Sequence, residues 1–328
     1  MKVVFVDVSD FEEAVMKRFK DEHPEIMIVM YKDDITKVKI EDFDADCLSI
    51  FINSRVDKNT LLKFTGLKFI FTRSTGFDHI DLESCGKNNI RVCNVPDYGS
   101  QTVAEFTFFL ILSLFRKINF SNNNSMKFLR GRELEGKSIG IIGAGKIGNN
   151  VGKIANAFGM NILYYSRSSS GYLDSINGKR LEFNELLSGS DVVTVHVPLN
   201  AATYHMINKD NIKLMKKDAI LINTSRGAVV DTDAVVEALD SNAIGGVGLD
   251  VIEGEEFSGK EMEIIKRKEN YDLIKQALET NILKGFDNAI LTPHIAYNTE
   301  EALTRIVNST CENIINAYKG ADLKNRII

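Results

Sequence analysis

The sequence has few cysteines, no surplus of basic residues and no apolar run long enough to cross a membrane, and each shortage excludes a class of protein. The 328 residues contain 4 cysteines, whose spacing matches neither a C-x-x-C motif nor a disulfide-rich secreted domain. Lys and Arg number 40 against 45 Asp and Glu, for a formal net charge of −5. We therefore expect no nucleic-acid or anionic-membrane partner and a location in the reducing cytoplasm.

Two apolar stretches are too short for a membrane role. The start, MKVVFVDVSD, meets an acidic residue at Asp7, too early for the core of a secretory signal, and is typical of a buried strand. The stretch FTFFLILSLF (106–115) spans only half of the ~20 residues that a membrane-spanning helix needs. It predicts instead a helix over 102–118 that is apolar on nearly every side and buried in the core or against a second subunit.

Strand-like runs alternate with helical patterns along the chain, which is typical of α/β proteins with parallel sheets. A chain of 328 residues also favours two domains. The expected strands lie at 2–8, 26–31, 47–52, 68–72 and 90–95 in a first series, and at 137–143, 161–166, 190–199, 218–225, 245–251 and 289–294 in a second.

The C-terminal part of the chain departs from this alternation. A polar, charged segment between 251 and 288 is expected at the surface, with helical spacing resuming at 271–283. The last helical pattern, 299–320, has no strand after it, so we expect it to pack back onto the first series. The residues predicted on one face of this helix are Leu303, Val307, Thr310, Ile314 and Tyr318.

The run GAGKIG (143–148) fits G-x-G-x-x-G between a strand and a helix, the context of a dinucleotide-binding turn. In such a turn Gly143 permits the bend, Gly145 lets the backbone approach a pyrophosphate, and Gly148 lets helix and strand pack closely. Lys146 and Ile147 lie within the same motif and are assigned to the cofactor with the glycines.

No carboxylate ends the next strand, where NAD sites usually have one for the ribose hydroxyls. The first acidic residue after the glycine motif is Asp174, and the turn holds Ser166, Arg167 and Ser168 instead. A guanidinium and hydroxyl groups suit a 2′-phosphate, which favours NADP(H) over NAD(H). The alternative is a solvent-facing arginine, with the ribose held by the serines.

Seven motifs, spread in order over nearly the whole chain, resemble those of the D-isomer-specific 2-hydroxyacid dehydrogenase family. They are STGFDHIDL (74–82), NVPDYGSQTVAEFT (94–107), GAGKIG, VHVPLN (195–200), NTSRGAVVD (223–231), GLDVIEGEE (248–256) and TPHIAYNTEEA (292–302). The resemblance implies an α/β protein of two doubly wound parallel-sheet domains. A Rossmann cofactor domain (100–294) would be inserted into a flavodoxin-like substrate domain (1–99 plus 295–328), with the active site in the cleft between them and a homodimer formed through helix 102–118.

The resemblance also assigns roles to individual residues. Arg226 would bind the substrate carboxylate and polarise the adjacent carbonyl, His294 would be the acid/base, and Glu255 would orient that histidine. The substrate-binding positions it implies are Ser74, Thr75, Gly76, Phe51, Tyr98 and Tyr297. The further cofactor positions it implies are Thr102, His196, Pro198, Thr203, Thr224 and Asp250. We expect no metal site, and interpret His23, His79 and His205 as structural.

Together these residues predict an oxidoreductase that reduces a small apolar 2-oxo acid to the (R)-2-hydroxy acid with a nicotinamide cofactor, as in the D-lactate dehydrogenase branch. A glyoxylate or hydroxypyruvate reductase would share every catalytic residue named, so that alternative stays open. A non-catalytic NAD(P)-sensing interaction protein is the alternative from another class, because this fold also serves transcriptional corepressors. The complete set of Arg226, Glu255 and His294 favours turnover.

Overall fold

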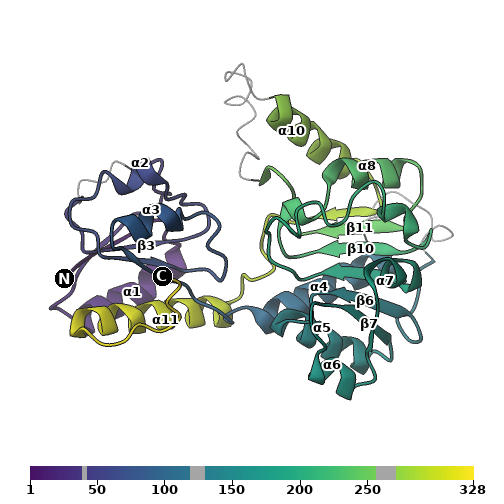
Figure 1. The fold of residues 1–328 in the computed structure, drawn as a ribbon, viewed down its shortest axis with the longest axis horizontal. Helices are drawn as coiled ribbons and strands as arrows, with labels where there is room; N and C mark the ends of the chain where they lie inside the picture. The colour runs from purple at the N-terminus through teal and green to yellow at the C-terminus, as the bar shows by residue number, and fades with distance from the viewer. Residues whose placement is uncertain (39–42, 119–129, 256–270) are drawn as a thin grey trace. The chain divides into compact units, whose positions relative to one another are not determined.

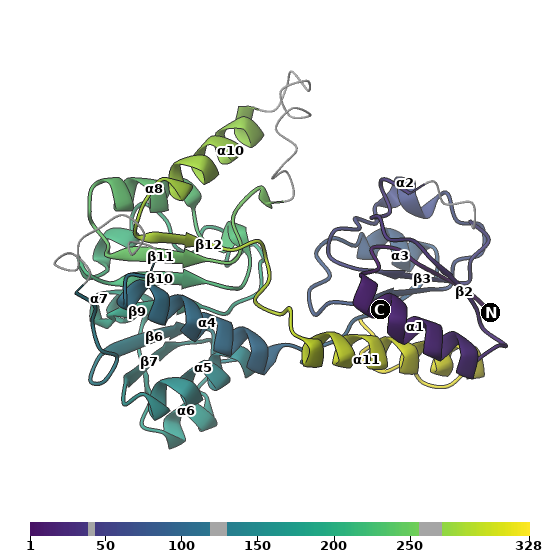
Figure 2. The same cartoon turned by 180° about the vertical axis from the view of Figure 1, so that it is seen from behind.

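The computed structural model describes residues 1–38, 43–118, 130–255 and 271–328 (Figures 1 and 2). The chain divides into two compact units, one of residues 1–98 with 298–328 and one of residues 99–297. Of the charged segment expected at the surface, residues 256–270 lie outside the described part. No helix within the described ranges has the length and apolar character needed to span a membrane.

The bounds of the units lie within a few residues of the domain limits expected from the sequence, 99/100 and 294/295. Gly99 is the N-cap of α4 (Ser100–Phe115), a helix that packs on the sheet of the second unit. Residues 295–297 also belong to the second unit. The reason is local, since the carboxylate of Asp250 accepts hydrogen bonds from the backbone N–H groups of Ile295 and Ala296.

The first unit is a five-stranded, all-parallel sheet in the order β2-β1-β3-β4-β5, which is the flavodoxin-like order. Its strands are β1 (Lys2–Phe5), β2 (Met27–Met30), β3 (Cys47–Ile50), β4 (Phe69–Thr72) and β5 (Arg91–Cys93). Its helices are α1 (Asp10–Glu22), α2 (Lys58–Leu61), α3 (Leu82–Lys87) and α11 (Glu300–Lys319). Each strand lies within a run expected from the sequence.

The C-terminal helix α11 packs beside α1 on one face of this sheet, as the sequence indicated (Figures 1 and 2). Its Val307 and Ile314 share a core cluster with Phe5 and Phe71. The predicted face was wrong at one end, because Tyr318 is 45% exposed. All four cysteines lie in this unit as buried free thiols, and burial raises the pKa of each of them.

A buried ion pair joins the first turn of α1 to the residue after β4. Arg73 Nε donates to Glu12 Oε1 at 2.8 Å, and the side chains are 1% and 6% exposed. Further donors of this guanidinium reach Ser49 Oγ and the carbonyls of Val6 and Asp7. Arg73 therefore fastens the carboxyl ends of several strands of the first unit.

The second unit is a seven-stranded parallel sheet in the order β12-β11-β10-β9-β6-β7-β8, a Rossmann order extended by one strand. Its strands are β6 (Ser138–Ile142), β7 (Asn161–Tyr165), β8 (Lys179–Arg180), β9 (Val192–Val195), β10 (Ile220–Asn223), β11 (Gly246–Leu249) and β12 (Ala289–Leu291). Its helices are α4, α5 (Lys146–Ala157), α6 (Gly171–Ser175), α7 (Phe183–Gly189), α8 (Thr232–Asp240) and α10 (Tyr271–Lys284), with 3-10 turns η3 (Ile212–Leu214) and η4 (Gly227–Val229). The sequence missed only β8, whose two exposed residues have no apolar pattern.

Helices cover both faces of this sheet. Successive residues of a strand point to opposite faces, so each strand contributes side chains to two core clusters. In β10, Ile220 and Ile222 face a cluster with α4 and α5, while Leu221 faces a cluster with α7 and α8. The apolar helix α4 is mostly buried in the first of these clusters. Phe109, however, is 51% exposed, and Ile118 just beyond the helix is 56% exposed.

Candidate active site

The glycine motif forms the turn from β6 into α5, and the space around each glycine fits its expected role. A Cβ on Gly143, which has φ +100°, would lie 2.5 Å from the carbonyl oxygen of His196, and one on Gly148 would lie 2.0 Å from that of Gly143. Gly145 has no neighbouring atom within 4 Å of its Cβ position, and no side chain caps α5. The helix N-terminus is therefore accessible to a phosphate group.

His196 follows β9, at the point where the strand order reverses between β6 and β9, the usual ligand position in such sheets. Its Nε2 lies 2.8 Å from Thr194 Oγ1. Its buried Nδ1 has no hydrogen-bond partner among the residues that the structure describes. Burial lowers the pKa of His196 to about 3, so the ring is neutral and the nitrogen can take part in recognising a bound ligand.

The turn after β7 is held by an arginine that the sequence did not single out. Arg180, on the short strand β8, donates from Nε and Nη2 to the carbonyl of Ser166, and from Nη2 to that of Arg167 at 3.0 Å. The Ser166 hydroxyl donates to the carbonyl of Ser168. Arg167 and Ser168 are exposed. Asp174, the first acidic residue after the glycine motif, accepts from Tyr164 Oη at 2.5 Å. Its carboxylate is therefore engaged by another side chain of the protein.

The three residues expected to carry the chemistry follow three adjacent strands. Arg226 comes after β10, Glu255 after β11 and His294 after β12, and these strands are neighbours in the parallel sheet. Glu255 Oε1 lies 2.7 Å from His294 Nδ1, and its Oε2 accepts from the backbone N–H of Ile252. With Nδ1 bonded to a carboxylate, the orientation of the ring is defined and Nε2 is the nitrogen left for a ligand.

Asp250 fixes the loop that carries His294. Its carboxylate, 1% exposed, accepts from Thr292 Oγ1 at 2.6 Å and from the N–H groups of Ile295 and Ala296 at 2.9 and 2.8 Å. Its backbone carbonyl also accepts from the N–H of His294. These bonds hold His294 at φ +53°, a conformation uncommon for a residue with a side chain. The role of Asp250 toward a cofactor stays a prediction.

The loop that carries Arg226 is organised by Asn223, a fully buried residue at the end of β10. Its Nδ2 donates to the carbonyl of Arg226 at 2.9 Å, and its Oδ1 accepts from Ser225. The guanidinium Nη1 of Arg226 donates to the carbonyl of Ser225 at 2.8 Å. Arg226 is half-buried, with its head group directed by these local bonds.

In the first unit, the turn of Ser74, Thr75 and Gly76 follows β4. The Ser74 and Thr75 hydroxyls donate to the carbonyls of Gly76 and Val95. Over the described ranges, no carbonyl or side chain accepts from the backbone N–H groups of these three residues. Such a row of N–H groups suits an anion. Phe51, in the neighbouring loop, lies under the Arg73 guanidinium at 5.9 Å.

The remaining predicted positions are placed as follows. Tyr98 accepts from Arg305 Nε through its carbonyl, and the Tyr297 ring lies 6.2 Å from the His294 ring, nearly perpendicular to it. The Thr224 hydroxyl lies 3.2 Å from that of Thr107 on α4. Thr102 is buried in the first turn of α4. The Thr203 hydroxyl donates to the carbonyl of Pro198 in the loop after β9. Lys146 and Ile147 lie in the first turn of α5.

Comparisons with known proteins show the family of this chain. Residues 108–296 match the family model for the NAD binding domain of D-isomer specific 2-hydroxyacid dehydrogenases. The chain belongs to this family. It is 35% identical over 292 residues to D-lactate dehydrogenase kk1H of Curvularia clavata, covering 87% of this chain and 82% of the relative. It is 37% identical over 289 residues to a glyoxylate reductase of Thermofilum pendens, covering 84% of this chain and 79% of the relative.

Among solved structures, the D-lactate dehydrogenase of Aquifex aeolicus complexed with NAD and lactic acid matches with a TM-score of 0.85 and 36% identity. The match covers 97% of this chain and 96% of that one. The fold and the family predicted from the motifs are thereby confirmed, and this 2-hydroxyacid dehydrogenase is an oxidoreductase with a nicotinamide-binding domain.

Proposed function

We propose that this 2-hydroxyacid dehydrogenase reduces a small apolar 2-oxo acid, of the pyruvate type, to the (R)-2-hydroxy acid. The observation that carries the proposal is the 2.7 Å contact between His294 Nδ1 and Glu255 Oε1, beside a loop that presents Arg226. An imidazole oriented by a carboxylate and a guanidinium on another loop at the same edge of the sheet are the groups needed to bind an oxo acid and protonate its carbonyl oxygen.

The reaction divides among the residues of this chain in a simple way. Arg226 binds the substrate carboxylate through two parallel hydrogen bonds and polarises the adjacent carbonyl. His294 donates a proton from Nε2 to the carbonyl oxygen, while Glu255 stabilises the positive charge that the ring carries before the transfer. The nicotinamide cofactor supplies the hydride. In the oxidative direction, neutral His294 takes the hydroxyl proton back.

The residues around the glycine motif fit a dinucleotide, because within the described ranges no side chain caps the N-terminus of α5 and none bonds the buried Nδ1 of His196. We propose NADP(H) as the preferred form, since Arg167 is exposed in a turn that lacks a carboxylate. The similar Aquifex aeolicus enzyme was solved with NAD, so the two cofactors must be compared directly. A higher kcat/KM with NADPH that Arg167→Ala abolishes supports the proposal, and a higher value with NADH refutes it.

The test of the reaction is a steady-state assay of NADPH and NADH oxidation with pyruvate, 2-oxoisocaproate, phenylpyruvate, glyoxylate and hydroxypyruvate. We expect pyruvate or its branched relatives to give the highest kcat/KM, and His294→Gln to lower kcat at least 100-fold, as general acid–base catalysis typically contributes ~10²–10⁴-fold. Cofactor binding should survive that substitution. Glyoxylate as the best substrate would select the glyoxylate reductase alternative. No turnover with any acid would select the sensing alternative.

We also propose that the protein acts as a homodimer through the segment 102–118, most of which is helix α4. The support is an apolar surface on this part of the second unit, where Phe109, Ile118 and Phe158 are 51%, 56% and 40% exposed. Exposed aromatic residues of this size favour burial against a second copy of the chain. Sedimentation velocity should give a dimer for the native protein and a monomer for Phe109→Asp. The buried free thiols further support a cytoplasmic location.

A further inference from the structure

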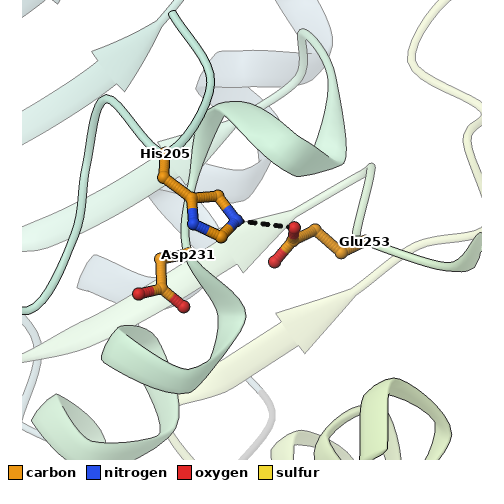
Figure 3. A group of neighbouring side chains, drawn as sticks. All are labelled: His205, Asp231 and Glu253. Carbon is orange, nitrogen blue, oxygen red and sulfur yellow. Dashed lines mark hydrogen bonds and ion pairs between the residues drawn. The ribbon is translucent and has the colours of Figure 1, made fainter. Parts of the chain in front are cut away.

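His205, Thr232 and Glu253 form a cluster at the carboxyl end of the second sheet, outside the proposed catalytic residues. We call it the three-loop cluster, because its members lie in or at the end of the loops after β9, β10 and β11, with Thr232 as the first residue of α8. Figure 3 shows the His205 ring between Glu253 and Asp231, with its Nε2 directed at the Glu253 carboxylate. That distance is 2.7 Å. Glu253 Oε2 accepts from both the backbone N–H and the hydroxyl of Thr232, each at 3.1 Å.

The cluster is well placed to act on the catalytic loops. Glu253 lies two residues before Glu255. The residue before Glu253, Ile252, donates its backbone N–H to the Glu255 carboxylate. The backbone at Gly227, next to Arg226, is in such close contact with this segment that an added Cβ would lie 2.3 Å from the Ile252 carbonyl carbon and 2.5 Å from the Glu253 nitrogen. A displacement of Glu253 would therefore shift both Glu255 and Arg226.

Hydrogen bonds add to the apolar packing of this region, where Val229 and Val230 are core residues and Ile252 packs against them. The Glu253 side chain is only 10% exposed, so a carboxylate that lost its partners would be left partly desolvated. His205 is itself held at φ +46° by a bond from its N–H to the carbonyl of Ala228.

We propose that His205 and Glu253 are positioning residues of this enzyme, which hold the Arg226 and Glu255 loops in register with each other through the three-loop cluster. This inference rests on the proposed roles of Arg226 and Glu255. The cluster also has residue types found in metal sites. Both Glu253 oxygens and His205 Nε2 are already bonded within the protein, however, and an ion would have to displace those bonds.

The first test compares His205→Gln with His205→Asn. A glutamine amide reaches the position of Nε2 and can donate to Glu253, whereas an asparagine amide mimics Nδ1 and leaves Glu253 without this partner. We expect His205→Asn to lower kcat/KM for the oxo acid about tenfold or more, mainly through kcat, and His205→Gln to stay within about threefold of the native enzyme. Equal activity of the two variants, at equal far-UV circular dichroism, overturns the proposal.

A double-mutant cycle tests whether His205 and Glu253 act as a pair. Glu253→Leu and His205→Asn should each lower kcat/KM, and the double variant should be no worse than the more severe single one. Effects that multiply would show two independent roles and overturn the proposal. A rise in melting temperature with Zn²⁺ or Mn²⁺ that His205→Gln abolishes would identify a cation site instead, which also overturns it.

Hydrogen exchange separates this inference from the proposed reaction, because it needs no turnover. In the native protein without ligands, the N–H of Thr232 should exchange slowly, and His205→Asn should speed exchange in peptides covering 226–232 and 250–255 but not in a control peptide covering 146–157. Unchanged exchange refutes the cluster even if the enzyme is active. Faster exchange in an enzyme that reduces no oxo acid would support the cluster and refute the reaction.

Discussion

The Asp250 carboxylate offers the sharpest test of how the second unit holds His294, the proposed acid/base. In Asp250→Asn the side chain keeps its shape, and an oxygen at the Oδ1 position can still accept from Thr292 and Ile295. The new NH₂ group then faces the N–H of Ala296, which now meets a donor instead of an acceptor. One charge-assisted bond is lost and one buried N–H is left unpaired, at a cost of about 2–3 kcal/mol.

This loss corresponds to a fall in melting temperature of about 4–12 °C for a unit of this size. It should also lower kcat several-fold, because the loop that holds His294 at its positive φ is loosened. Thermal unfolding and NADPH or NADH oxidation measure the two effects on the same sample. Asp210→Asn is the matched control, since that side chain is 97% exposed. A variant at position 250 with native melting temperature and native kcat would refute the reasoning.

Three further outcomes follow from the structure. Glu12→Ala leaves the Arg73 charge buried without its carboxylate partner. It should lower the free energy of unfolding by about 3–5 kcal/mol in urea titrations. An unshifted urea midpoint would contradict the role of the ion pair. Arg180→Gln should raise the KM for the cofactor several-fold with little change in kcat, because only the turn at Ser166 is released; a change confined to kcat would speak against it. Burial lowers the pKa of His196 from 6.5 to about 3 in the folded protein. Below pH 6.5 the unfolded chain therefore binds one more proton than the folded chain. The free energy of unfolding then falls as the pH falls, by up to about 1.4 kcal/mol per pH unit. His196→Asn should flatten that fall between pH 6.5 and 5 in melting-temperature measurements, and an identical slope would exclude this histidine as the cause.

Most of the fold was predictable from the sequence, because strands and helices are set by short-range patterns. The apolar runs of the parallel strands are fully buried, as in β10 and β11, and this kind of burial produces continuous hydrophobic segments that are easily recognised. The two residues of β8 carry no such signal, since both are exposed. The unit bound at 297/298 lies just beyond the expected limit, next to bonds between Asp250 and a loop 45 and 46 residues away in the chain, which the sequence does not show.

The candidate site divides in the same way. Motifs identified Arg226, Glu255 and His294, since each has a residue type and a position after a strand that suit the chemistry. The sequence contains no indication that Arg180 holds the turn after β7 through backbone carbonyls, because any residue has a carbonyl to offer. Asn223 lay within a quoted motif, but its part in shaping the Arg226 loop became visible only from its buried bonds.

Glu253 and Glu255 illustrate which features the sequence determines and which only the tertiary structure determines. The sequence alone determines the α/β alternation, the glycine-rich turn and the presence of Glu253 and Glu255 after β11, because these follow from residue type and spacing. Which carboxylate serves which histidine is decided by the tertiary structure, where Glu253 meets His205 at a separation of 48 residues and Glu255 meets His294 at 39. Partners so far apart in the chain are chosen by the order of strands in the sheet and by the path of each loop, which only the folded chain defines.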